Sequence, residues 1–287
     1  MSRKFFCVSL NIKSIIFFLI AAISFGIFAH SKKTSVKTDA GSVNVPIIMY
    51  HSILRDPSKS GTYVITQNQL EEDFKYLKAN GYTCIFVNDL IEYVNGETHL
   101  PPKPIILTFD DGHYNNETYL LPLLEKYDQR AVISIVGKYT EDYSQNPDEN
   151  PNYAYLSWKN VNELLESGRI EIGNHSYNMH SIGKRKGTHK IKGETSDAYA
   201  AALTADIEKM QLLCHDNLGL TPKVFTYPFG SVSTESYDVL KNCGFAASLS
   251  CGEGMNCITS DKEDLYMLKR CIRTNKRSVQ NILDEIT

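Results

Sequence analysis

Short apolar runs alternate with longer amphipathic segments along the chain beyond residue 44. The apolar runs predict strands over 45–50, 83–87, 104–109, 131–136, 170–173, 223–228, 245–249 and 266–270. Apolar residues at helical spacing predict helices over 69–80, 117–127, 158–168, 198–219, 233–244 and 278–286. Four helices meet a glycine just before the next strand, as left-handed caps do, at Gly81, Gly168, Gly219 and Gly244. This alternation indicates a parallel α/β sheet, either open and doubly wound or closed as a barrel.

The remaining segments narrow the class of protein. The polar stretch 139–156 predicts a long surface loop. No glycine-rich phosphate-binding motif follows any predicted strand, which removes support for a nucleotide-binding protein. The 287 residues carry a formal net charge of −3, whereas a nucleic-acid-binding protein normally has a basic excess. A chain of this length can bury a sizeable core.

The N-terminus differs in kind from the rest of the chain. Three basic residues precede the apolar segment 15–29, and a polar stretch follows it, which is typical of a secretory signal peptide or a signal-anchor. As a helix this segment would rise only about 22 Å, short of the roughly 30 Å hydrocarbon core, which favours a cleaved signal peptide. Ile27-Phe28-Ala29 is a poor cleavage site, which favours a retained anchor.

These features predict three parts of the chain. Residues 1–30 form the signal peptide or signal-anchor, 31–44 a polar linker, and 45–287 a single folded domain that lies outside the cytoplasm, either membrane-anchored at the cell surface or secreted. An exported protein can form disulfides, and Cys251 with Cys257 could close a small loop, although buried free thiols fit the sequence as well. No pair of cysteines has the spacing of a structural zinc site.

Residues that could take part in catalysis or metal binding gather where predicted strands end. They are His51, Asp110, Asp111, His175, His180, Phe229, Gly230 and Arg270. In parallel α/β folds these strand ends share one face, which is where the chemistry occurs. Two histidines and one carboxylate make the three-ligand set of a catalytic metal site with an open position for water. The adjacent acids Asp110 and Asp111 can then differ in task, because one binds the cation while the other accepts a proton from the attacking water.

Three motifs resemble a known family. They are "TFDDG" (108–112), "HSYNMH" (175–180) and "YPFG" (227–230), and the likeness extends from about residue 45 to the C-terminus. This combination resembles the polysaccharide deacetylases of carbohydrate esterase family four, the NodB-homology enzymes. The resemblance implies a distorted (β/α) barrel of about seven strands in one domain. It also implies metal-dependent removal of N-acetyl groups from N-acetylglucosamine polymers.

Departures from the common pattern point to one branch of that family. The two histidines are five residues apart rather than four, Thr226 replaces an arginine, and the usual C-terminal Leu-x-x-His is absent. An N-terminal "PIIMYHSI" stands where many relatives have no such element. This combination resembles the circularly permuted branch, which includes poly-N-acetylglucosamine deacetylases.

The resemblance implies a role for each candidate residue. Asp110 matches the general base, and the metal ligands are Asp111, His175 and His180. His51 takes the general-acid role, and Arg270 orients Asp110, with Arg273 as the alternative. The backbone N–H of Phe229 is expected to hold the oxyanion, and Tyr227 is expected to contribute to substrate binding.

The expected cofactor is one divalent metal ion, with zinc as the default and cobalt, nickel or iron as alternatives. The expected partner is a polysaccharide containing N-acetylglucosamine, either peptidoglycan or a secreted poly-N-acetylglucosamine, and no nucleic acid. The membrane becomes a partner if the N-terminal segment is uncleaved, and the protein is expected to be a monomer. Two other functions stay open: an esterase that removes O-acetyl groups, and an inactive carbohydrate-binding protein on the same fold.

Overall fold

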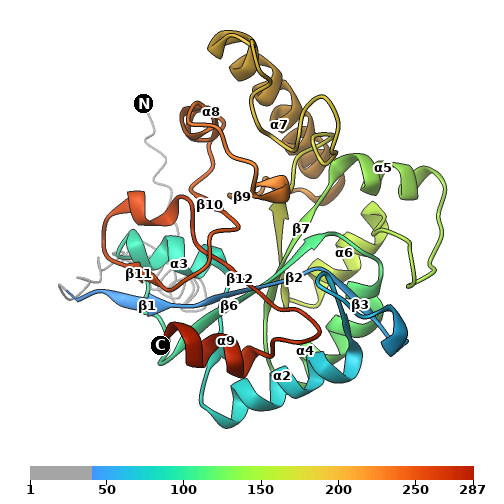
Figure 1. The fold of residues 1–287 in the computed structure, drawn as a ribbon, viewed down its shortest axis with the longest axis vertical. Coiled ribbons are helices and arrows are strands. Elements are labelled where there is room, and N and C mark those ends of the chain that lie inside the picture. The colour runs from blue at the N-terminus through green and yellow to red at the C-terminus, as the bar shows by residue number, and fades with distance from the viewer. Residues whose placement is uncertain (1–40) are drawn as a thin grey trace, which may run out of the picture. The chain divides into compact units, whose positions relative to one another are not determined.

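The computed structural model describes residues 41–287, which fall within one compact unit (Figure 1). The predicted signal peptide or signal-anchor and most of the predicted linker lie outside the described residues. Strand β1 begins at Val43, two residues before the predicted start of the domain. Within 41–287, no helix combines the length and the apolar character needed to cross a bilayer.

A parallel sheet forms the centre of the fold, in the order β10-β9-β8-β7-β6-β2-β12, with β5 paired to the start of β6. Its strands are β2 (Ile47–Tyr50), β5 (Thr83–Cys84), β6 (Pro104–Asp111), β7 (Ala131–Ile135), β8 (Ile170–Asn174), β9 (Val224–Thr226), β10 (Ala247–Leu249) and β12 (Cys271–Ile272). The seven strands of the main path curl into an incomplete barrel, which confirms the predicted fold class. Their near-continuous apolar sequence suits a parallel sheet that is covered on both faces.

The segment before β12 links the two edges of this sheet. Leu268 forms an isolated parallel bridge with Leu249 of β10, and Cys271 pairs with Ile48 of β2. The predicted strand over 266–270 is therefore wrong in position. Met267 adopts a left-handed backbone conformation with φ of 59°, which interrupts the extended chain and delays the regular strand to Cys271.

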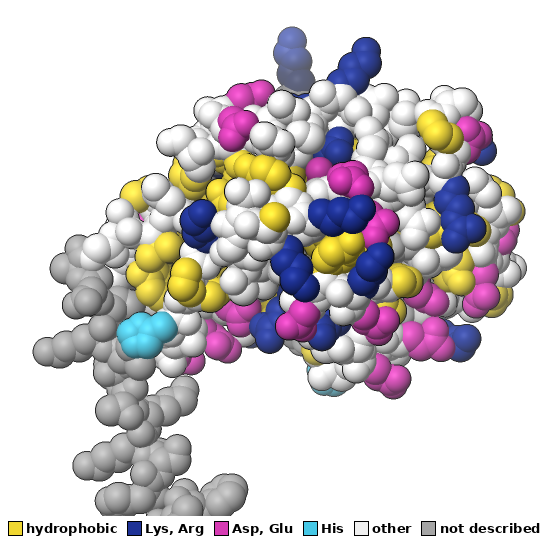
Figure 2. Space-filling view, turned by 90° about the horizontal axis from the view of Figure 1, so that it is seen from below, with side chains coloured by type: hydrophobic (Ala, Val, Ile, Leu, Met, Phe, Trp, Pro, Cys, Tyr) yellow, Lys and Arg dark blue, Asp and Glu magenta, His cyan; other side chains and the backbone are white. Residues whose placement is uncertain are grey.

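Helices cover the sheet in three groups (Figure 1). They are α2 (Gln67–Ala79), α3 (Val87–Val94), α4 (Leu121–Tyr127), α5 (Gly137–Gln145), α6 (Trp158–Glu166), α7 (Ser196–Leu218), α8 (Ser236–Asn242) and α9 (Val279–Ile286). The largest apolar core packs the sheet against α2, α4, α6 and α9, a second core lies under α3, and a third joins α7 and α8 to β9. The face that carries α2, α4 and α9 shows basic and acidic side chains interspersed (Figure 2).

Two small ribbons complete the described structure. Strand β1 (Val43–Val45) pairs antiparallel with β11 (Asn256–Ile258), and β3 (Ser52–Leu54) pairs parallel with β4 (Val64–Thr66). None of these four short strands was predicted as such. Strand β3 continues directly from the loop residue His51 and helps to hold that residue at the edge of the barrel.

The predicted loop over 139–156 is wrong in its first part, because α5 occupies Gly137–Gln145. This helix lacks an apolar stripe, since only Gly137 and Thr140 are buried. The rings of Tyr139 and Tyr143 pack on Tyr155, and a Lys138–Asp142 ion pair at the surface, four residues apart, adds only a small contribution. By contrast, the four predicted glycine caps are confirmed, with φ values between 67° and 82°.

Six cysteines lie in the described part of the chain, and all six are free thiols. The disulfide considered between Cys251 and Cys257 is not formed, and both residues are exposed. Cys84, Cys214 and Cys271 are buried, in agreement with the alternative of buried free thiols for those three positions.

Candidate active site

A tight turn at the end of β6 presents the two adjacent acids. Asp110 and Asp111 pair in register with Ser134 and Ile135 of β7, so both still belong to the sheet. Asp111 and Gly112 then take left-handed conformations, with φ of 76° and 73°. A side chain on Gly112 would meet Ile135 Cγ2 at 2.9 Å, so only glycine fits there. Left-handed backbone at Asp111 is strained, and such strain is common at functional sites.

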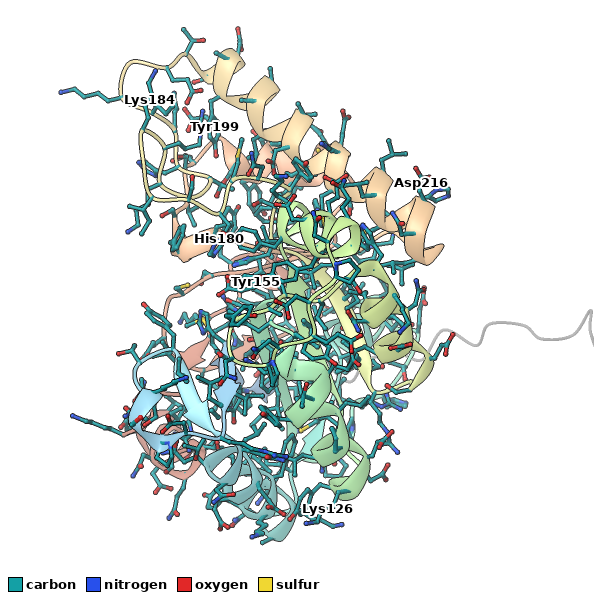
Figure 3. The ribbon with its side chains drawn as sticks, turned by 90° about the vertical axis from the view of Figure 1, so that its right-hand side faces the viewer. Lys126, Tyr155, His180, Lys184, Tyr199 and Asp216 are labelled. Atoms are coloured by element: carbon teal, nitrogen blue, oxygen red, sulfur yellow. The ribbon has the colours of Figure 1, made fainter. Side chains whose placement is uncertain are left out.

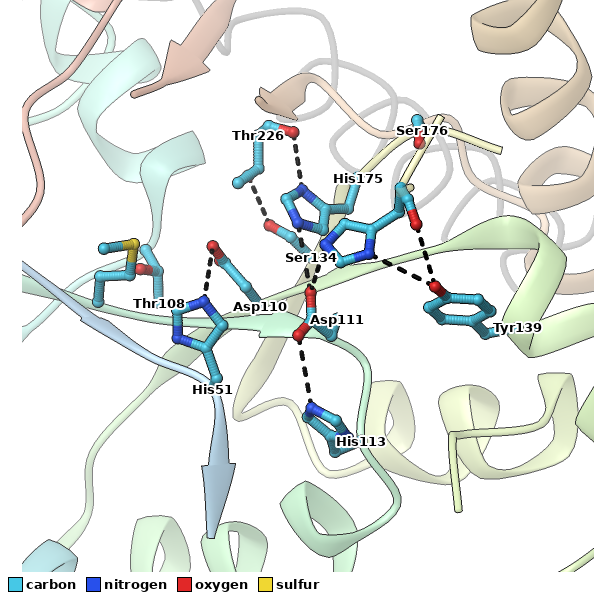
Figure 4. A network of polar contacts seen from close by, with 12 residues as sticks. His51, Thr108, Asp110, Asp111, His113, Ser134, Tyr139, His175, Ser176 and Thr226 are labelled. Carbon is cyan, nitrogen blue, oxygen red and sulfur yellow. Dashed lines mark hydrogen bonds and ion pairs between the residues drawn. The ribbon is translucent and has the colours of Figure 1, made fainter. Parts of the chain in front are cut away.

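Asp111, His175 and His180 form a cluster whose ligating atoms all lie within 4.8 Å of one another. Asp111 Oδ1 lies 3.5 Å from His175 Nε2 and 3.0 Å from His180 Nε2 (Figure 4). That oxygen is buried and accepts no well-aligned hydrogen bond from the described residues. Three donor atoms facing a common point, one of them unsatisfied, fit a divalent cation with an open position.

Neighbouring groups fix the orientation of both histidines. His175 Nδ1 lies 2.8 Å from the carbonyl oxygen of Thr226, so Nδ1 carries the proton and Nε2 keeps its lone pair. On the other histidine, the hydroxyl of Tyr139 lies 3.5 Å from His180 Nδ1 and donates to the His180 carbonyl at 3.2 Å. Such outer contacts preorganise a metal site.

The pKa of Asp111 is held well below its ordinary value. Burial by itself would raise it, but the neighbouring imidazoles of His113, His175 and His180 outweigh that cost. The carboxylate therefore stays ionised, as a metal ligand must. His113 Nε2 lies 3.5 Å from Asp111 Oδ2, the oxygen that faces away from His175 and His180.

Asp110 is 2% exposed and forms a bidentate ion pair with Arg270, which is fully buried. The two Nη–Oδ distances are 2.7 and 2.9 Å. Arg270 also donates to the carbonyl of Ser250 and to the hydroxyl of Thr108, so its guanidinium is fixed on several sides. Burial would raise the pKa of Asp110, but the charges of Arg270 and of the nearby histidines hold it below its ordinary value.

Arg273, the alternative partner for Asp110, lies elsewhere. It pairs with the buried Asp73, with Nε–Oδ2 and Nη2–Oδ1 distances of 2.8 and 3.2 Å. Asp73 also accepts hydrogen bonds from the hydroxyl of Tyr50 and the N–H of Val279. This second buried pair therefore joins α2 to the start of α9 and does not contact Asp110.

The two arginines offer a matched pair of variants. Arg270→Met and Arg273→Met each leave one buried carboxylate without its cation, so each is expected to lower the free energy of unfolding by about 3–5 kcal/mol. Chemical denaturation of the two variants would measure this loss. Only Arg270→Met should also lower turnover at a temperature where both variants are folded, because only Arg270 contacts Asp110. Equal turnover in the two folded variants would contradict a positioning role for Arg270.

His51 faces Asp110 across the open side of the site (Figure 4). Its Nε2 lies 4.0 Å from Asp110 Oδ2, beyond hydrogen-bond length, and its side chain is 15% exposed. Its Nδ1 is buried and has no hydrogen-bond partner among the described residues. The ring of Tyr63 packs edge-on against the His51 ring at 4.8 Å.

Phe229 and Tyr227 lie in different environments. Phe229 has a left-handed backbone with φ of 57° and is 37% exposed, and its ring lies 4.4 Å from that of His180. Within the described part of the chain, its N–H donates no hydrogen bond, so it is available to a ligand. The side chain of Tyr227 is 1% exposed and its hydroxyl contacts Ser236 Oγ, so it does not line the open site.

Several residues around the site were not identified from the sequence. His113 follows Asp111 by only two positions, and this spacing is the one signal that could have drawn attention to it. Its ring stacks on that of Tyr155, which in turn packs against Tyr139 at 4.4 Å. Thr226 acts through its backbone carbonyl, which no side-chain pattern reveals.

Comparisons with known proteins agree with this geometry. Residues 97–248, just over half of the chain, match the family model described as polysaccharide deacetylase. The chain is 23% identical to the poly-beta-1,6-N-acetyl-D-glucosamine N-deacetylase of Escherichia coli (strain K12), over 83% of this chain and 38% of that protein. It is 24% identical to the protein of the same description from Staphylococcus aureus (strain MRSA252), over 71% of this chain and 66% of that one.

A solved structure supports the same fold. The de-N-acetylase from Aggregatibacter actinomycetemcomitans superposes with a TM-score of 0.72 at 22% identity, over 84% of this chain and 99% of that one. The chain thus spans well under half of the E. coli relative and about two thirds of the S. aureus relative. Since the family model covers the strand that carries both acids and the segment that carries both histidines, the chain belongs to the polysaccharide deacetylase family.

Proposed function

We propose that this protein is a metal-dependent N-deacetylase that hydrolyses the acetamide of N-acetylglucosamine units in a polysaccharide and releases acetate. One observation carries the proposal: a cluster of three candidate metal ligands lies beside a buried carboxylate that is paired with a buried arginine. Asp111, His175 and His180 make the cluster, and Asp110 with Arg270 makes the neighbouring pair. The two adjacent acids then have different tasks, because Asp111 is a metal ligand and Asp110 is free to act as the general base.

Each remaining group has a place in this reaction. Asp110 accepts the proton of the attacking water, and Arg270 keeps it ionised and oriented. His51 lies on the opposite side and donates a proton to the leaving amine. The free N–H of Phe229 donates to the developing oxyanion, and one such preorganised donor contributes roughly 3–4 kcal/mol.

The ligand set favours zinc, and histidine and carboxylate ligands also accept cobalt, nickel or iron. When bound, such a cation polarises the carbonyl and makes water a stronger nucleophile at neutral pH. The chain's own contribution is the fixed orientation of His175 by Thr226 and the ionised state of Asp111.

The names of the relatives support a polymer of N-acetylglucosamine as the substrate. Peptidoglycan, which also contains N-acetylglucosamine, is the other candidate polymer. An N-acetylglucosamine pentamer incubated with the metal-loaded protein should yield acetate and free amine in equal amounts. Acetate from an O-acetylated xylan alone would favour an esterase, and no product from either would favour an inactive carbohydrate-binding protein.

We also propose that the protein works outside the cytoplasm, because residues 1–30 have the composition of a signal peptide or signal-anchor. Protease added to intact protoplasts should then digest the domain. N-terminal sequencing of the mature protein distinguishes the two forms, since a retained anchor leaves a start near Met1 and a cleaved signal leaves a start at or beyond His30.

A further inference from the structure

The segment 181–194, here called the basic loop, follows the proposed metal ligand His180 directly. It holds five lysines and arginines and one acid, Glu194. Residues 41–287 as a whole hold 24 lysines and arginines against 32 aspartates and glutamates, so this concentration of positive charge runs against the balance of the domain. On the face that carries α2, α4 and α9, by comparison, basic and acidic side chains are interspersed (Figure 2).

Ion pairs use two of the five cations to hold the loop in shape. Arg185 pairs with Glu194 at 2.6 Å, and Lys190 pairs with Glu235 near the start of α8. Lys184, Lys186 and Lys192 are exposed and form no ion pair with any described residue. Two basic side chains thus hold the loop in place, and the three remaining lysines are available to bind another partner.

The base of the loop is anchored to the active-site rim. Gly187 packs so closely on the Pro228–Ser231 turn that a side chain there would meet the Pro228 carbonyl at 2.5 Å. Thr188 donates to the carbonyl of Ser231, and the N–H of Lys190 donates to Ser233 Oγ. A group bound by the loop is therefore presented beside Phe229, the proposed oxyanion donor.

The outer part of the loop is a short hairpin. The N–H of Gly187 donates to the carbonyl of Ser181, and Ile182 bridges Lys186, which leaves Lys184 at the tip. Lys184 lies three residues from Gly187 at the base of the loop, and three residues span at most about 10 Å. The tip therefore lies within reach of a polymer that occupies the site. Figure 3 shows Lys184 at the outer end of the loop, beyond His180, with its side chain directed away from the fold.

We propose that the basic loop binds negatively charged substituents on the glycan that enters the active site, so that the preferred substrate is an anionic polymer containing N-acetylglucosamine. This inference rests on the proposed deacetylase function and narrows its substrate class. Lysine ammonium groups are compact point charges that suit scattered carboxylates or phosphates along a flexible strand. Attraction of this kind raises the rate of encounter and weakens as salt increases.

A lipid surface is the other polyanion that lysines attract, and the structure argues against it. Ile182 is 75% exposed but is the single large apolar side chain at the tip of the hairpin. One aliphatic side chain contributes too little buried apolar surface for stable membrane binding. The position of the loop, attached to the Pro228–Ser231 turn, also suits a ligand that continues into the active site.

The test compares soluble chitin derivatives that share a backbone and differ in charge. Carboxymethyl chitin carries carboxylates, and glycol chitin carries neutral hydroxyethyl groups. At low salt the metal-loaded full chain should show a kcat/KM about fivefold to tenfold higher for carboxymethyl chitin, as expected for two or three exposed charge contacts. In Lys184→Gln/Lys186→Gln this ratio should fall to between one and two.

A second double variant controls for net charge. Lys223→Gln/Lys262→Gln removes two exposed lysines outside the loop and should keep the wild-type ratio. A wild-type ratio near one, or equal ratios in the two double variants, would overturn the inference. Phosphorylated chitin identifies the charged group, since a preference for it over the carboxymethyl polymer points to phosphate and the reverse points to carboxylate.

Binding distinguishes failure of this inference from failure of the proposed function. Fluorescence anisotropy of the labelled polymers should show tighter binding of the carboxymethyl form to wild type, lost in Lys184→Gln/Lys186→Gln. If neither polymer is deacetylated but this preference persists, the proposed function fails and the charged subsite stands. Lysine-dependent binding to vesicles of anionic phospholipid, without any preference between polymers, would overturn the inference in favour of a lipid surface.

Discussion

Asp110→Asn is expected to lower kcat on an N-acetylglucosamine oligomer by about 10²–10⁴-fold while metal content stays stoichiometric. The amide keeps the size of the carboxylate and can still accept one hydrogen bond from Arg270, but it removes the charge that balances this buried arginine, so turnover should be measured at a temperature where the variant is folded. It cannot accept the proton of the attacking water, and so the loss should fall on kcat rather than on KM. Acetate release and metal analysis on the same sample would measure both effects.

Asp111→Asn provides the matched control, because the residue next in sequence should behave differently. It is expected to weaken metal affinity by more than the 10–100-fold that loss of an outer-sphere group costs, since Asp111 contributes a ligating oxygen. His175→Ala should do the same. If Asp110→Asn and Asp111→Asn gave the same metal titration, the proposed division of tasks between the two acids would be wrong.

His51→Ala is expected to reduce turnover on N-acetyl substrates by about 10²–10⁴-fold and to leave metal content unchanged. An amine is a poor leaving group unless it is protonated, whereas 4-nitrophenolate leaves readily. The same variant should therefore lose much less activity on 4-nitrophenyl acetate. Near-normal turnover on the oligomer would return His51 to a structural role at the end of β2.

The pH profile gives a second measure of His51. Burial lowers the pKa of His51 below its ordinary value, against the raising effect of the Asp110 and Asp111 carboxylates. Because the acid is active when protonated, the alkaline limb of kcat/KM should appear at a lower pH than an unperturbed histidine would give. In His51→Ala that limb should disappear. An unchanged limb would mean that another group supplies the proton.

Much of the fold and of the site followed from simple patterns in the sequence. The buried run of β6 ends in two acids, and parallel strands carry their chemistry at that end, so the position of Asp110 and Asp111 at the end of a strand could be predicted from the sequence. His175 and His180 were identified in the same way. The structure brings the candidate ligands within 4.8 Å of one another, and their catalytic roles remain predictions.

Other features depend on the direction in which a side chain points and on its packing against distant segments, and no local sequence pattern reveals these. Arg270 and Arg273 lie three residues apart, and the structure pairs Arg270 with Asp110 and Arg273 with Asp73, a choice that no local sequence pattern indicates. Helix α5 escaped prediction because it has no stripe of buried apolar side chains. Tyr227 sits in a promising motif, yet its side chain turns into the core beside α8.

The pairing of Asp110 with Arg270 also bears on how the protein folds during its synthesis. These residues are 160 positions apart, and Arg273 contacts Asp73 across 200 positions. A ribosome completes the chain from the N-terminus, so the acids of β6 emerge long before the cations that neutralise them. Contacts of such long sequence separation raise contact order and slow folding. A nascent chain that has not yet reached Arg270 would therefore hold the metal-ligand motifs but no partner for Asp110, and so activity should arise only after Arg270 has been made and folded into place.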